Sequence, residues 1–221
     1  MKELIVSQGT SGGVTSNLVP ADYASEIGKL KFVINSALAG LKVAMPVKVI
    51  SVSNSGGLSP IGTVNVQPMV SMLDGSGEAW PHGIIHNVPY MRIQGGANGI
   101  ILDPAIGDIG IATVCDRDIS TVQNTGKVSI PGSLRKHDMS DMVYLMTIIG
   151  AAPTQYVQFN STGINIVSPV AVTITAPAIN TNGTWNHTGT LTATGDIIGA
   201  GTSLHTHTHP DPQGGNTGAP N

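Results

Sequence analysis

The residues best able to do chemistry are three histidines near the C-terminus, His205, His207 and His209, which alternate with threonines. In an extended strand, residues two apart point to the same face, so the pattern predicts three imidazoles on one side. Alternating histidine is typical of a metal site, because neutral imidazole is a common ligand of transition metals. One strand supplies two such ligands to an ion at best, which is too few for a tight site.

A threefold assembly would change this ligand count. Two imidazoles from each of three identical chains give six nitrogens, an octahedral set around the common axis. Zinc prefers four tetrahedral ligands, so a six-nitrogen site favours iron or nickel. The other interpretations of the cluster are a solvated terminus and an affinity tag. The tag is disfavoured because threonines separate the histidines and a Pro-Asp-Pro-Gln-Gly-Gly sequence follows them.

The remaining histidines carry a weaker signal. His82 and His86 are four residues apart, which would suit a helix, but a proline and a glycine near them disrupt one. We therefore expect a surface loop there. His137 lies beside Arg135 and Lys136 and is expected to be solvated, as is His187 in a turn.

No catalytic set emerges from the sequence. It lacks a serine-centred elbow, a Cys/His/Asn group and a His-Glu-x-x-His helix. Its single cysteine, Cys115, stands in an apolar run and is expected to be a small buried hydrophobe. A metal-dependent hydrolase built on the histidines would need a nearby general base, and only Asp211 is available. We expect that the protein is not an enzyme.

The composition points to an uncharged surface hidden between subunits. With 10 Lys+Arg against 13 Asp+Glu, the net charge is -3, which argues against a nucleic-acid partner. Charged residues make up only 10% of the chain, against roughly 25% in ordinary soluble domains, and this favours an obligate oligomer. No apolar stretch is long enough to span a membrane, and no signal peptide is evident. We expect synthesis in the cytoplasm, without a secretory address.

The periodicity predicts a mainly β protein after one helix. Residues 1–41 are expected to form an N-terminal arm and a helix that begins near Ala21. Residues 42–118 are expected to form an OB-fold barrel, because short β-branched runs alternate there with turn clusters. The predicted strands are Val43–Val52, Gly62–Val70, Val88–Ile93, Gly99–Leu102 and Gly107–Cys115.

Beyond the barrel, a connector at 119–142 leads into a shaft at 143–202 and an apex at 203–221. The shaft consists of short alternating segments: Tyr156–Phe159, Ile164–Ile166, Val170–Thr175, Ala178–Asn180 and Thr190–Thr194. Period-two alternation indicates that one side of each strand is buried, yet each segment is too short to build its own core. The pattern therefore predicts strands that pair with identical chains, as in β-helices and solenoids, and such intertwining removes exposed edges.

The chain resembles the membrane-piercing central spikes of contractile-tailed bacteriophages, the Mu-like and related baseplate tip proteins. The segments that carry the resemblance are Gly107–Ala112 with Cys115–Asp118, Thr192–Ala200, and Ser203-Leu204 followed by His207–His209, Gln213-Gly214 and Thr217–Pro220. The first looks like the end of the family's OB domain, the second like the last turns of its β-helix, and the third like its apex.

The resemblance implies a homotrimer at the tip of the virion's tail baseplate, with an intertwined, trimeric triple-stranded β-helix at 143–202 and a metal-capped apex. The wide end would be held by a tail hub or baseplate protein, and contraction would drive the point through the outer membrane of the host. In the family, the His-x-His motif of each chain binds one shared iron ion, which implies His207 and His209 here. His205 is an extra histidine, so His205 with His207 is the alternative pair. The alternative function is the spike or plug of a bacteriocin or secretion-type injection system.

Overall fold

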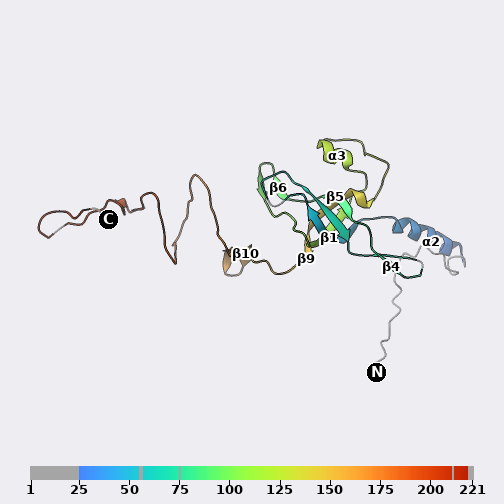
Figure 1. Ribbon diagram of the computed structural model, residues 1–221, viewed down its shortest axis with the longest axis horizontal. Coiled ribbons are helices and arrows are strands. Elements are labelled where there is room, and N and C mark those ends of the chain that lie inside the picture. Colours follow the sequence, from blue (N-terminus) through green and yellow to red (C-terminus); the bar gives the residue numbers. More distant parts are fainter. Residues whose placement is uncertain (1–24, 55–56, 75, 211, 219–221) are drawn as a thin grey trace, which may run out of the picture. The chain divides into compact units, whose positions relative to one another are not determined.

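The computed structural model describes residues 25–54, 57–74, 76–210 and 212–218, and it is mainly β with few helices (Figure 1). The chain divides into two units, residues 1–154 and residues 155–221. The predicted arm and the predicted start of the helix, up to residue 24, lie outside the described residues.

The first unit is organised by a five-stranded antiparallel sheet. Its strands, in spatial order, are β5 (Ile85–Pro89), β2 (Thr63–Pro68), β1 (Ala44–Val52), β8 (Ile109–Val114) and β9 (Met142–Ile149). Tyr90, directly after β5, forms a parallel bridge with Tyr144 of β9, and the Met91 N–H donates to the Tyr144 carbonyl at 2.8 Å. The two end strands thus meet, and the sheet curls around its own core.

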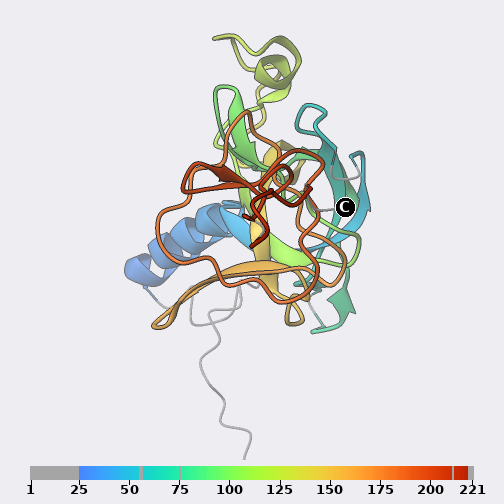
Figure 2. The ribbon, with the colours of Figure 1, turned by 90° about the vertical axis from the view of Figure 1, so that its left-hand side faces the viewer.

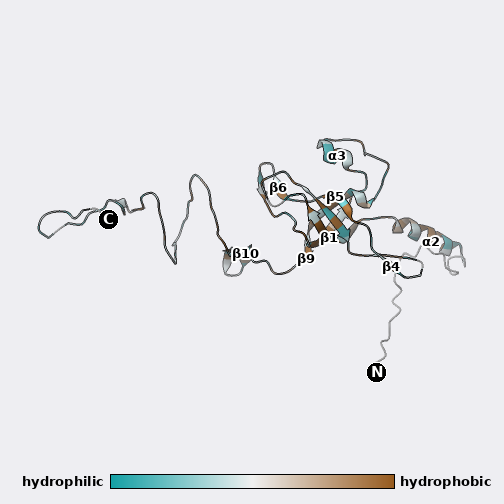
Figure 3. Ribbon diagram, viewed as in Figure 1, coloured by the Kyte–Doolittle hydropathy of each residue, from teal (hydrophilic) through white to brown (hydrophobic). Residues whose placement is uncertain are grey.

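Alternation along these strands supplies the core. Apolar and polar residues stand side by side along the sheet in Figure 3, as expected for strands with one buried face. The buried side chains come from all five strands and the residue after β5: Val47, Val49, Val64, Val66, Val88, Tyr90, Ala112, Val114, Met142 and Tyr144.

Gly110 makes room for the largest of these side chains. A Cβ atom at Gly110 would overlap the Tyr144 ring and the Met146 carbonyl oxygen. β8 therefore has a glycine at the position where the Tyr144 ring of β9 packs against it. The two strands pair at Gly110 and Thr147, and the register shifts next to this pair.

In the described part of the first unit, two hairpins and three helical elements accompany the sheet. The hairpins are β3 (Met72–Leu73) with β4 (Ala79–Trp80), and β6 (Ile93–Gly95) with β7 (Asn98–Ile100). The helices are α2 (Glu26–Ala39), α3 (Ser120–Thr125) and the 3-10 turn η1 (Met139–Asp141). The predicted helix is present as α2, where the Ser25 hydroxyl oxygen accepts the Gly28 N–H at 3.0 Å as an N-cap. No residue of α2 is buried.

The sheet differs from the predicted barrel in its last strand. The run predicted at 99–102 corresponds to β7, which pairs only with β6. The fifth strand is β9, which the predicted boundaries had divided between the connector and the shaft. β9 belongs with the sheet because it pairs with the open edge of β8 and buries Met142 and Tyr144. The first unit thus continues to Thr154, beyond the predicted boundary at 118.

The second unit contains two hairpins and a long segment without regular structure. The hairpins are β10 (Tyr156–Asn160) with β11 (Gly163–Val167), and β12 (Ile198–Gly199) with β13 (Thr202–Ser203). The strands predicted at 170–175, 178–180 and 190–194 are absent from the single chain. A strand needs a hydrogen-bonded neighbour, and the described part of the chain places no other strand beside these three segments. No described residue between 155 and 218 is buried.

Candidate metal-binding apex

The candidate site begins at the β12–β13 hairpin. Ile198 pairs with Ser203 and Gly199 with Thr202. The two residues between them, Ala200 and Gly201, have φ angles of +50° and +85°. Positive φ at both central residues is the geometry of the tight turns that match the twist of a hairpin.

His205 lies in a turn after this hairpin and not in a strand. The Ser203 hydroxyl oxygen accepts the N–H groups of His205 and Thr206 at 3.1 and 2.9 Å. The His207 N–H donates to the Ser203 carbonyl at 3.2 Å. These local bonds compete with an extended backbone. None of the three histidines lies in a strand, so the prediction that they share one strand face is wrong.

His207 and His209 do come together. Their ring centroids are 5.0 Å apart and their planes are nearly perpendicular, at 87°. Nδ1 of His207 lies 3.1 Å from the Leu204 carbonyl oxygen. Since a carbonyl can only accept, Nδ1 carries the proton and the lone pair of Nε2 is left for a ligand. Such a backbone contact is how metal-binding histidines are commonly oriented.

The segment after His209 folds back and holds it in place. The His209 N–H donates to the Thr217 hydroxyl oxygen at 2.9 Å, and the Thr217 N–H donates to the His209 carbonyl at 2.9 Å. Pro210 and Asn216 form an antiparallel bridge beside this pair. Both the Thr217 backbone and its side chain thus fix His209. Asp211, the base that a hydrolase would require, lies outside the described residues.

Asp196, just before β12, bonds to the turn that contains His205, and sequence reasoning gave it no role. Its Oδ1 accepts the His205 N–H at 3.1 Å. A hydrogen bond from the Ser203 side chain, together with backbone N–H groups, lowers the pKa of Asp196 below its ordinary value. The carboxylate therefore stays ionised and ties the turn to the hairpin. The sequence did contain a signal for this role, because Asp196 is an acidic residue in an otherwise almost uncharged stretch.

The donor set fits a metal only when several chains contribute. Within the part of the chain that the structure describes, no three His, Cys, Asp or Glu side chains gather as a metal-holding group. His207 and His209 give one chain a pair of imidazole side chains. Three such pairs would supply the six nitrogens of an octahedral iron site.

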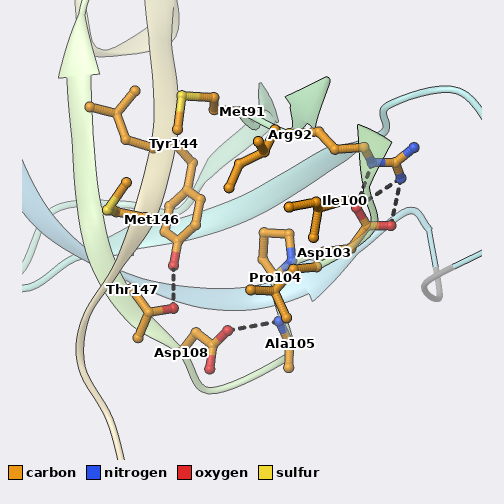
Figure 4. Close-up of a pocket in the computed structure, with 13 residues that line it drawn as sticks. Met91, Arg92, Ile100, Asp103, Pro104, Ala105, Asp108, Tyr144, Met146 and Thr147 are labelled. Atoms are coloured by element: carbon orange, nitrogen blue, oxygen red, sulfur yellow. Dashed lines mark hydrogen bonds and ion pairs between the residues drawn. The ribbon is translucent and has the colours of Figure 1, made fainter. Parts of the chain in front are cut away.

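The first unit has a groove of its own, lined on one side by Tyr144 and Met146 and on the other by Ile100 and Pro104 (Figure 4). The Tyr144 hydroxyl lies 3.3 Å from the Thr147 hydroxyl, and burial raises the pKa of Tyr144. The groove is predominantly apolar.

Next to the groove, Arg92 holds Asp103 in a buried ion pair. Nε and Nη2 of Arg92 donate to the carboxylate at 2.9 and 2.7 Å, and both side chains are only 3% exposed. Nη1 donates to the Ser59 carbonyl at 2.8 Å. The arginine thus joins two loops to the start of β6, which is a structural role.

A second ion cluster closes the loop that carries α3, which projects from the sheet in both views (Figures 1 and 2). Arg135 lies 3.0 Å from Asp118 and 3.1 Å from Asp141, and both carboxylates are 2% exposed. Hydrogen bonds from Ser120 and Ser133, and then the charge of Arg135, lower the pKa of Asp118 to about 2. Sequence reasoning missed this cluster because Asp118 stands at the end of the predicted barrel, whereas Arg135 and Asp141 stand in the apparent connector.

The other candidate residues have ordinary surroundings. His86 and His187 are exposed and His82 is half-buried. His137 differs from expectation, because its Nδ1 is buried without a hydrogen-bond partner in the described part of the chain. Cys115 is a half-buried free thiol, and burial raises its pKa, so it stays protonated.

Residues 45–147 match the family model described as the phage protein Gp138 N-terminal domain. The match supports a phage structural protein. No curated protein matches the chain. The matched residues run from β1 to β9 and so cover the five-stranded sheet almost completely. The match is consistent with a virion component. It ends at residue 147, before the second unit begins at residue 155.

Proposed function

We propose that the protein is the central spike of a contractile phage tail. It is a homotrimer without enzymatic activity, and its apex pierces the outer membrane of the host when the tail contracts. The first unit is an OB-type barrel that a tail hub or baseplate protein holds. The curled five-stranded sheet with its Tyr90–Tyr144 closure supports the barrel, since an OB-fold is a five-stranded Greek-key barrel.

The observation that carries the proposal is the exposure of the second unit. Val172 and Ile174 are 56% and 66% exposed, and Leu191 is 55% exposed. Regularly spaced aliphatic side chains that stay in water gain nothing from the hydrophobic effect. Identical chains wound around one axis would bury these side chains. They would also provide hydrogen-bond partners for the backbone between 168 and 197, which forms no strand in the single chain. A triple-stranded β-helix does both.

The apex fits the end of such a trimer. His207 and His209 of each chain would hold one iron ion with six imidazole nitrogens, and the ion would tie the three chain ends together. Metal binding would stabilise the folded apex because the ligands converge only when the chains are assembled. The tail sheath supplies the force for penetration, so the spike itself needs stiffness and a tip that does not fray.

Metal analysis and sedimentation equilibrium of the full-length protein test the proposal. We expect a trimer with one iron per three chains. Changing both His207→Ala and His209→Ala should remove the iron and leave the barrel folded, whereas the matched change His205→Ala should keep it. A monomeric protein, or a protein purified without bound metal, would contradict the proposal. Loss of iron in His205→Ala would instead indicate the alternative pair.

A further inference from the structure

The connections between the strands of the five-stranded sheet gather at its two ends. β1, β5 and β9 run in one direction and β2 and β8 run in the other, because every neighbouring pair in the sheet is antiparallel. We call the end where β1, β5 and β9 begin the entry end, and the opposite end the exit end. β9 finishes at the exit end, and the chain leaves there for the second unit.

The connection between β8 and β9 lies at the entry end and carries uncovered aliphatic side chains. Its residues 119–136, which we call the α3 loop, include the helix that projects from the sheet in Figures 1 and 2. Val128 is fully exposed, Ile130 is 82% exposed and Leu134 is 97% exposed. Large aliphatic side chains that gather on a surface in this way mark a site of protein contact. The α3 loop therefore has the chemistry of a docking element.

The α3 loop is held in one shape at its base and at the end of its helix. At the base, Arg135 bonds to both Asp118 and Asp141. Gly126, with a φ of +62°, ends α3 and donates its N–H to the Val122 carbonyl at 2.8 Å. A loop that is already ordered loses little conformational entropy when it binds a partner.

The charges of the α3 loop indicate what kind of surface it fits. The loop contains Lys127, Arg135 and Lys136 and no Asp or Glu. Arg135 is paired at the base, whereas no ion pair is found for either lysine among the described residues. Copies of the loop that met one another would bring these lysines together, and like charges repel. The surface that suits both the aliphatic side chains and the lysines is an apolar one bordered by carboxylates.

The helix α2 brings the same chemistry to the entry end. It leads into the start of β1, and its Ile27 and Leu30 are 67% and 60% exposed. Residues 26–42 contain three lysines against one glutamate. The remaining connection at this end, residues 69–84, carries two acidic residues and no Lys or Arg, so it is not part of the proposed surface.

We propose that the α3 loop, together with α2, is the part of the spike that the tail hub protein grips, and that it enters an apolar hollow of the hub bordered by Asp and Glu side chains. This inference rests on the proposed function, and it assigns the joint to two projecting elements and not to the wall of the barrel. The entry end suits this role because the chain leaves for the shaft at the exit end.

Photo-cross-linking in assembled tails tests the contact. A benzophenone amino acid in place of Leu134, in tails produced by the phage that encodes the chain, should link to a second tail protein within a segment rich in Asp or Glu. The matched control is the same replacement at Leu58, which is 96% exposed in the loop between β1 and β2 at the exit end. The control should not link to that protein. Equal linkage from both positions, or linkage of position 134 to another copy, to lipid or to nothing, would overturn the inference.

Rebinding of the purified protein to tails made without it supplies the second measurement. Leu134→Asp, and Lys127→Glu combined with Lys136→Glu, should each lower the number of spikes bound per tail by roughly tenfold or more. Leu58→Asp should bind as the wild type does. All these variants should sediment like the wild type, because the changed side chains are exposed.

The two possible failures of this experiment are distinguishable. Variants of the α3 loop that bind tails like the wild type would overturn the role of the loop and leave the spike proposal standing. A wild-type protein that does not join the tails would overturn the spike proposal itself. Added salt should weaken the binding of the wild type more than that of the double lysine variant, because salt screens the attraction between opposite charges. Equal salt dependence would overturn the proposed carboxylate border.

Discussion

The two units use the same alternation of apolar and polar residues with opposite outcomes. In β1 and β2 alternating side chains such as Val47, Val49 and Val64 are at most 1% exposed. In the second unit the alternating Ile164 and Ile166 are each 62% exposed, and no described residue is buried. Alternation determines which side of a strand seeks burial. It does not determine whether the covering surface belongs to the same chain.

The difference follows from how each unit pairs its backbone. The five strands of the first unit form a sheet whose ends meet at Tyr90 and Tyr144, so its core is complete within one chain. The second unit has two isolated hairpins and an intervening stretch without a strand. In the proposed trimer, other chains would supply the missing burial and backbone pairing, which would tie the folding of this unit to assembly.

Breaking the buried ion pair of the first unit should have the largest effect. Arg92→Ala leaves Asp103 charged, buried and unpaired, and such a loss costs about 3–5 kcal/mol of unfolding free energy. The matched control is Arg117→Ala, because Arg117 pairs with Asp116 at 3.7 Å on an exposed surface and should cost about 0–1 kcal/mol. Urea unfolding of the two variants measures both values. Equal losses of unfolding free energy in the two variants would contradict a stabilising role of the buried ion pair within the first unit.

Substituting one glycine in each unit compares how closely the two units are packed, and the expected effect is of intermediate size. Gly110→Ala places a methyl group against Tyr144 and should cost about 1–3 kcal/mol through overpacking. At Gly195 no atom of the same chain lies within 4 Å of an added Cβ, so Gly195→Ala should leave the first unit unchanged. Hydrogen exchange of the β8 and β9 amides reports the first effect. A shift in trimer dissociation for Gly195→Ala would reveal a neighbouring chain at that position.

Acid should weaken the first unit by a smaller amount. The pKa of Asp118 lies at about 2 in the folded chain against its ordinary 3.8, so the group contributes stability above about pH 4. That contribution is lost as the pH falls from about 4 to about 2. Asp118→Asn should flatten this part of the dependence. The measurement is the unfolding free energy at pH 5 and at pH 2.5, and an unchanged slope in the variant would contradict the assignment.

Local patterns predicted the elements that depend on local forces. The helix at Glu26–Ala39 and the strands at 156–160 and 163–167 lie where periodicity and turn residues indicated. The sequence also indicated His207 and His209, whose rings the structure brings together. Sequence reasoning failed where long-range pairing decides. β9 was assigned to the shaft, and Arg135 was taken as part of a polar connector.

The sequence by itself determined a mainly β chain, the positions that seek burial and the histidines available as ligands, because these follow from side-chain type and spacing. Only the tertiary structure decided that β9 completes the sheet, that Arg135 joins Asp118 to Asp141, and that His205 lies in a turn bonded to Ser203. Those outcomes depend on hydrogen bonds and packing between residues far apart in the chain, or on a single serine that competes for the backbone. Spacing along the sequence does not contain that information.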